Sequence, residues 1–91
     1  MIGKICIVRC RDAGVHVGVV EEYCNRMVRL TDSRRIWRWA GANTLNELSV
    51  SGLASGRISD SVPEIVLLDA CEILPISETA KETLTRGRWD D

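Results

Sequence analysis

Hydrophobic and polar residues alternate along the first 40 residues in a way that predicts three consecutive β-strands. Residues 2–11 are rich in Ile and Val and are apolar at both alternating sets of positions, as is typical of a central strand with two covered faces. Residues 15–23 and 27–39 continue the strand pattern, and the third strand is interrupted near residues 32–33. Short turns at 12–14 and 24–26 join these strands into an antiparallel meander.

The periodicity changes after Gly41, where the sequence predicts a short helix. Thr44 and Glu47 have the spacing of a capping box, in which a hydroxyl and a carboxylate satisfy free N–H groups at a helix start. We therefore expect a helix over residues 45–51. A second helix is expected over residues 78–86, because Ser77 has the chemistry of an N-cap.

Between the two expected helices the sequence predicts one loop and one strand. Residues 52–63 are rich in Gly and Ser, which favours a loop of twelve residues, and loops of that length are usually functional or held by a neighbour. Residues 64–74 form the most apolar run and are expected to be a single buried strand. Residues 88–91 are expected to form a C-terminal tail.

These elements predict one domain over residues 1–91 of the α+β class. The expected order is β-β-β-α-β-α, a small and mostly antiparallel sheet with two short helices. A small barrel of SH3-like curvature is the alternative, since the interruption in the third strand would let that strand bend across two sheets.

The distribution of charge adds information about partners. The formal net charge of −1 argues against a polycationic nucleic-acid binder, so an RNA or single-strand DNA partner is disfavoured. Residues 1–59 carry nine basic and five acidic side chains, whereas residues 60–91 carry three basic and eight acidic ones. Such asymmetry, in a domain with a small core, predicts a homo-oligomer in which basic and acidic surfaces meet.

The cysteines and the histidine favour structural roles over catalysis or metal binding. Cys6, Cys10 and Cys71 lie in apolar runs, and Cys24 falls in the expected hairpin turn, so free thiols are expected, the first three buried. His16 is the one histidine, beside valines, and has no evident catalytic partner. We expect no enzyme activity, no metal site and no cofactor.

The residues with the most distinctive chemistry lie between the third strand and the first helix. Strict alternation would place Trp37 and Trp39 on one face as an aromatic plate, with guanidinium groups beside them and a helix N-terminus close by. These parts suit a nucleotide, which has a base to stack and a phosphate to pair. The candidate ligand-binding residues are Arg34, Arg35, Trp37, Arg38, Trp39, Asn43 and Thr44. The competing interpretation makes the tryptophans core residues and the arginines a solvated face or a subunit interface.

The run RRIWRWAGANTLNEL, followed by SGRISDSVPEIVLLDACEILPIS and a final RW, resembles a family of short bacteriophage and prophage proteins, a domain of unknown function. The resemblance extends from about residue 6 to residue 89 and carries no functional residue with it. It implies a viral protein expressed in the cytoplasm of an infected bacterium. The absence of a signal-peptide pattern or a long apolar segment agrees with that location and with no membrane partner.

The leading functional hypothesis is therefore a phage accessory protein that acts without catalysis. It would assemble as a homo-oligomer and sequester a small anionic, nucleotide-like ligand such as a host immune signal, as an anti-defence sponge. The alternative is a structural virion or assembly protein whose Arg-rich face meets an acidic neighbour.

Overall fold

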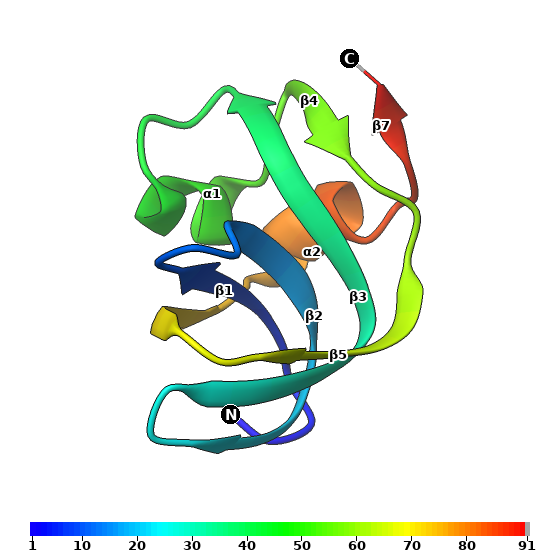
Figure 1. The fold of residues 1–91 in the computed structure, drawn as a ribbon. Helices are drawn as coiled ribbons and strands as arrows, with labels where there is room; N and C mark the ends of the chain where they lie inside the picture. The colour runs from blue at the N-terminus through cyan, green and yellow to red at the C-terminus, as the bar shows by residue number, and fades with distance from the viewer. Residues whose placement is uncertain (91) are drawn as a thin grey trace.

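The fold is an antiparallel β-sheet carrying two short helices, as seen in a computed structural model that describes residues 1–90 (Figure 1). Its elements are β1 (Ile5–Cys10), β2 (Val15–Cys24), β3 (Met27–Ala40), α1 (Leu45–Ser51), β4 (Ser55–Ile58), β5 (Val62–Leu67), β6 (Ala70–Pro75), α2 (Glu78–Leu84) and β7 (Trp89–Asp90). Every strand pairing is antiparallel. The predicted α+β class, with a small antiparallel sheet and two short helices, is confirmed.

The long strand β3 organises the sheet. The strand order is β6-β1-β2-β3-β4-β7, and β5 also pairs with β3. Residues 28–33 of β3 pair with β5, whereas residues 36–40 pair with β4. Figure 1 shows that β3 bends between these two parts. The bend that the alternative of an SH3-like barrel required in the third strand is thus present. Residues 59–61 connect β4 to β5, so the strand paired with this edge of β3 changes there.

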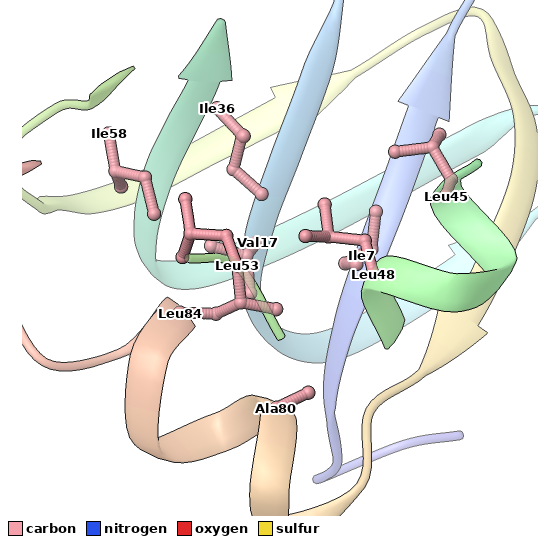
Figure 2. Packing of buried hydrophobic residues seen from close by; sticks show 9 residues of the cluster. All are labelled: Ile7, Val17, Ile36, Leu45, Leu48, Leu53, Ile58, Ala80 and Leu84. Carbon is pink, nitrogen blue, oxygen red and sulfur yellow. The ribbon is translucent and has the colours of Figure 1, made fainter. Parts of the chain in front are cut away.

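The sheet separates two clusters of buried residues. The first, which we call the helix-side core, joins the sheet to both helices and consists of Ile7, Val17, Ile36, Leu45, Leu48, Leu53, Ile58, Ala80 and Leu84 (Figure 2). The second, the strand-side core, consists of Cys6, Val8, Cys10, Val20, Val28, Leu30 and Leu67. Consecutive β1 residues enter opposite cores, so the prediction that β1 is covered on both faces is confirmed.

The helices begin where the sequence predicts. The Thr44 hydroxyl accepts a hydrogen bond from the Glu47 N–H at 3.2 Å, and α1 follows at residues 45–51. Gly52 ends α1 with φ of 76°, a conformation that favours glycine. The Ser77 hydroxyl caps α2 by accepting from the Ala80 N–H at 3.0 Å, and α2 ends at Leu84, two residues earlier than expected.

The predicted loop over residues 52–63 is wrong, because it contains strand β4. The hydropathy pattern does not reveal this strand, because the strand is only four residues long and contains Gly56. Gly56 pairs with Trp39, and a Cβ at that position would collide with the Arg38 carbonyl oxygen and lie 3.0 Å from the Trp39 Cα. The glycine thus lets β4 approach β3 closely.

The predicted single buried strand over residues 64–74 is also wrong. Leu68 and Asp69 form a turn that divides this run into β5 and β6. Asp69 holds the turn in place, because its carboxylate accepts a hydrogen bond from the Asp12 N–H at 2.6 Å. The outer face of β5 is exposed despite its composition, and Val66 and Leu68 are 47% and 75% accessible.

Ion pairs across the sheet join the basic and acidic parts of one chain. Arg9 of β1 pairs with Glu72 of β6 at 3.0 Å, and Arg29 of β3 pairs with Glu64 of β5 at 3.0 Å. The uneven distribution of charge along the sequence is therefore partly neutralised within the fold, which weakens the argument from charge for an oligomer.

The expected C-terminal tail contains β7, which pairs with β4. Trp89 of β7 packs against the helix-side core, and its indole N–H donates to the Thr83 carbonyl at 2.9 Å. The last predicted tail residue, Asp91, lies outside the described residues.

Candidate functional site

A β-bulge places Trp37 and Trp39 in different environments. Ile36 pairs with Ile58, and Arg38 pairs with Arg57, so two residues of β3 oppose one residue of β4. The bulge breaks the alternation of side chains. Trp39 then packs against the helix-side core on the same side as Ile36, whereas Trp37 is 60% accessible. The two indoles do not share the single aromatic plate that strict alternation predicts.

Trp37 is the aromatic centre of the candidate site. The guanidinium of Arg57 lies over its ring, with Cζ 5.2 Å from the ring centroid, in a cation–π contact. Trp37 lines two open hollows. One, of about 380 Å³, lies against the turn at residues 12–14 and is also lined by Arg35 and Trp39. The other, of about 420 Å³, lies against β7 and is also lined by Trp89.

Arg35 supplies a cation beside Trp37. Two hydrogen bonds to Ser59 fix its backbone. The Arg35 N–H donates to the Ser59 hydroxyl at 2.9 Å, and the Ser59 N–H donates to the Arg35 carbonyl at 3.0 Å. Its side chain is exposed. Within residues 1–90, no hydrogen bond or ion pair engages the Arg35 guanidinium. A rigid backbone therefore presents an unengaged positive charge.

Arg35 also lines a third hollow, of about 280 Å³, at the place where the neighbour of β3 changes from β4 to β5. Its other lining residues are His16, Ser33, Ser59, Val62 and Ile65. The three hollows share lining residues: Arg35 belongs to the first and third, and Trp37 belongs to the first and second. We call this group of adjoining hollows the Arg35/Trp37 site.

The titratable groups near the third hollow are poorly suited to nucleophilic chemistry. Burial lowers the pKa of His16 below its ordinary value of 6.5, and the nearby guanidinium of Arg35 lowers it further. One ring nitrogen of His16, Nε2, lies 2.9 Å from the Ala13 carbonyl oxygen, so it is the nitrogen that carries the proton. Burial raises the pKa of Cys10 to about 11, and the carboxylate of Asp69 adds to the increase, so this thiol stays protonated at neutral pH.

The structure brings some of the predicted site residues together and separates others. Arg35, Trp37 and Trp39 meet at the first hollow. Arg34 is half-buried and donates to the Ser59 carbonyl at 3.3 Å, which is a structural contact. Arg38 is exposed on the bulge.

Asn43 and Thr44 serve the start of α1 and do not line the hollows around Arg35 and Trp37. Thr44 caps the helix, and the Asn43 N–H donates to the Glu47 carboxylate at 3.1 Å. The negative charge of the Glu47 carboxylate therefore lies beside the start of α1 and disfavours an anionic ligand there. This arrangement removes the helix end from the site that the sequence suggested.

Sequence reasoning missed several residues that line the site, among them Ser33, Ser59, Val62 and Trp89. Trp89 comes close to Trp37 only because β7 pairs with β4 beside β3, and the pairing of such a short strand is invisible in the sequence. The interruption at residues 32–33 was a usable signal for Ser33, since bulges often lie beside functional sites.

All four cysteines are free thiols, as expected, but only Cys6 and Cys10 are buried. Cys71 is exposed, contrary to expectation, because it belongs to β6, which lies at the edge of the sheet beside β1, and not to one buried strand. In the part of the chain that the structure describes, no group of His, Cys, Asp and Glu side chains is arranged to hold a metal ion. No helix among residues 1–90 is long and apolar enough to cross a membrane.

A protein-family model matches residues 3–84 of the chain. The chain belongs to the DUF6948 family. The family is described as a domain of unknown function, so it assigns no role to the residues of the Arg35/Trp37 site. No curated protein and no solved structure matches the chain.

Proposed function

We propose that this protein is a non-catalytic binding module that holds a small, planar, anionic ligand of nucleotide-like chemistry at the Arg35/Trp37 site. The observation that carries the proposal is the exposed indole of Trp37 beside the unengaged guanidinium of Arg35. A large aromatic side chain left in solvent next to positive charge is suited to stacking and ion pairing together.

The energetics favour a ligand that combines a ring and a negative charge. Stacking of one base on an aromatic side chain contributes about 1–3 kcal/mol. Arg57 lies over one face of the Trp37 ring in a cation–π contact, and we propose that a base stacks on the opposite face or replaces this guanidinium. A ligand that stacks on Trp37 places its charged part within reach of Arg35, because both residues line the same hollow.

A binding role agrees with the state of the nucleophilic groups. The Cys10 thiol is protonated at neutral pH, and the one proton of the neutral His16 ring is held by the Ala13 carbonyl. A site of this kind can retain a ligand without changing it. The use we propose is sequestration of a nucleotide signal in an infected bacterium, in keeping with the resemblance of the sequence to phage and prophage proteins.

A second candidate function, that of a virion or assembly protein, is supported by a different surface. The outer face of β5 exposes Val66, which is 47% accessible, and the turn after it exposes Leu68, which is 75% accessible. Such apolar side chains suit contact with another protein chain. This candidate predicts a mass above the 10.1 kDa monomer in light scattering, or recovery of the protein in virus particles by mass spectrometry.

The proposal is tested by titrating the purified protein with a panel of mono-, di- and cyclic nucleotides while tryptophan fluorescence is recorded. We expect saturable quenching by at least one nucleotide and weaker binding at higher salt, because Arg35 contributes an ion pair. Protein that has carried a ligand through purification will also show raised absorbance at 260 nm. If no nucleotide in the panel binds, the proposed function is wrong and the assembly role replaces it.

A further inference from the structure

The third hollow of the Arg35/Trp37 site contains a buried hydroxyl group that has no partner. Ser33 is 2% accessible, and its Oγ makes no hydrogen bond with any part of the chain that the structure describes. A buried hydroxyl without a partner gives up its hydrogen bonds to water without replacing them, which is a substantial free-energy cost to a folded protein. A cost of this size calls for a reason, and Ser33 lines a hollow that reaches the exposed side chain of Arg35.

Ser33 is held in place by a strained part of the backbone. Val17 pairs with Arg34 and Val19 pairs with Thr31, so residues 32–33 of β3 oppose Gly18 alone in a second bulge. Asp32 has φ of 49°, a left-handed conformation that is uncommon for residues other than glycine. A Cβ on Gly18 would lie 3.1 Å from the Ser33 Cα, so the glycine relieves crowding where β2 approaches this bulge. Strain of this kind is typical of binding sites, where it directs a side chain.

The electrostatic character of the hollow is positive. Its lining residues include one cation, Arg35, and no carboxylate. His16 stays neutral because burial lowers its pKa, and its Nε2 proton is already donated to the Ala13 carbonyl. The Ser59 hydroxyl donates to the Asp60 carbonyl at 3.0 Å and accepts from the Arg35 N–H, so it has no proton to give a ligand. The donors that remain are the Ser33 hydroxyl and the Arg35 guanidinium.

We infer that this hollow is the oxyanion subsite of the proposed ligand site. It receives a phosphate or carboxylate group, which accepts one hydrogen bond from the Ser33 hydroxyl and charge-assisted hydrogen bonds from the Arg35 guanidinium. The planar part of the same ligand stacks on Trp37 outside the hollow. The inference rests on the proposed function and deepens it, because it names the residues that select a ligand with a terminal oxyanion over its neutral analogue.

The test compares AMP with adenosine, which lacks the phosphate, in the wild type and in Ser33→Ala. We expect the wild type to bind AMP more tightly than adenosine. Ser33→Ala should weaken AMP binding about tenfold, because it removes a hydrogen bond to a charged group, and should leave adenosine binding unchanged. Inorganic phosphate should compete with AMP in the wild type and compete less well in the variant.

A second readout is the stability of the ligand-free protein, with Ser49→Ala as the matched control. Ser49 is also buried, but its hydroxyl donates to the Asn46 carbonyl at 2.7 Å. Ser49→Ala should lower the melting temperature without changing the preference for AMP. Ser33→Ala removes a hydroxyl without a partner and should raise the melting temperature by about 4–8 °C.

Four results would overturn the inference. Equal binding of AMP and adenosine by the wild type, or unchanged AMP binding in Ser33→Ala, rules out the subsite while the stacking site on Trp37 stands. A lower melting temperature in Ser33→Ala shows that the hydroxyl has a structural partner. If Ser33→Ala does not fold, Arg35→Gln at the exposed rim replaces it, and loss of the preference for AMP is again the expected result. Binding of neither compound rejects the subsite and the proposed function together.

Discussion

The two parts of β3 have similar alternating sequence patterns, but they differ in their pairing partners and in their burial. Residues 28–31 are paired on both edges, by β2 and by β5, and they contribute Val28 and Leu30 to the strand-side core. Residues 37–40 have β4 on one edge, while the pairing with β2 ends at Ile36. In the first part the strand is a structural centre. In the second part it carries an exposed tryptophan at the border of open hollows.

This difference shows that the strands paired with β3, and not hydropathy alone, decide which of its residues are available for binding. Trp37 and Trp39 are chemically identical and two residues apart, yet one bulge sends Trp39 to the helix-side core and leaves Trp37 in solvent. If this is correct, substitutions in the first part of β3 should lower stability, and substitutions at the exposed tryptophan of the second part should weaken binding.

The largest effect is expected in the first part of β3. Leu30 is fully buried in the strand-side core, so Leu30→Ala should lower the free energy of unfolding by about 2–5 kcal/mol. That is a large share of the roughly 5–14 kcal/mol expected for a domain of this size. Urea denaturation measures it. A loss below about 1 kcal/mol would show that this part of β3 is not a structural centre.

A smaller effect on stability is expected at Trp39, and almost none at Trp37. Trp39 is partly buried, so Trp39→Ala should cost about 1.5–3 kcal/mol of unfolding free energy. Trp37 is 60% accessible, and Trp37→Ala should change the free energy of unfolding by about 0.5 kcal/mol or less. Thermal melts of the two variants provide a direct comparison. Equal losses would contradict the assignment of the two indoles to different roles.

The pH dependence of stability should reveal the protonation of His16. Burial lowers the pKa of this side chain below its ordinary value of 6.5. The folded protein holds this ring neutral, so the unfolded chain binds the proton more readily. The stabilisation is full above pH 6.5 and is lost as the pH falls through the lower pKa of the folded state. Urea denaturation between pH 8 and 5 should show this decrease. His16→Gln should show a flatter profile, and an unchanged profile in that variant would assign the decrease to other groups.

Thiol reactivity should distinguish the strand-side core from the surface without any change in stability. Cys24 and Cys71 are exposed, whereas Cys6 and Cys10 are buried and burial raises the pKa of both thiols. At pH 8 we expect a disulfide reagent to label two thiols in the native protein and four after denaturation. Rapid labelling of all four in the native protein would mean that the strand-side core opens readily.

The regular elements with strong local signals could be predicted from the sequence. Both helices start at the expected N-caps, because a hydroxyl that accepts from the backbone three residues later is a purely local interaction. The first three strands follow from their β-branched residues and their short turns. Asn25 in the second turn adopts φ of 55°, as its small polar side chain allows.

The remaining elements depend on contacts between distant residues, which a single sequence does not display. β4 and β7 are four and two residues long, and each forms only because β3 or β4 offers an edge. The division of residues 64–74 at Leu68 depends on Asp69 reaching the Asp12 N–H. For the same reason Arg35 and Trp37 could be named from sequence, whereas Ser33, Ser59 and Trp89 could not be placed beside them.

The central claim is that Trp37, and not Trp39, forms the stacking surface of a ligand site. The most direct measurement is the affinity of Trp37→Ala for the nucleotide that binds the wild type most tightly, determined by isothermal titration calorimetry at low salt. We predict a loss of about 1–3 kcal/mol, or about 5- to 150-fold, with the melting temperature close to that of the wild type. Wild-type affinity in a folded Trp37→Ala variant would contradict the claim.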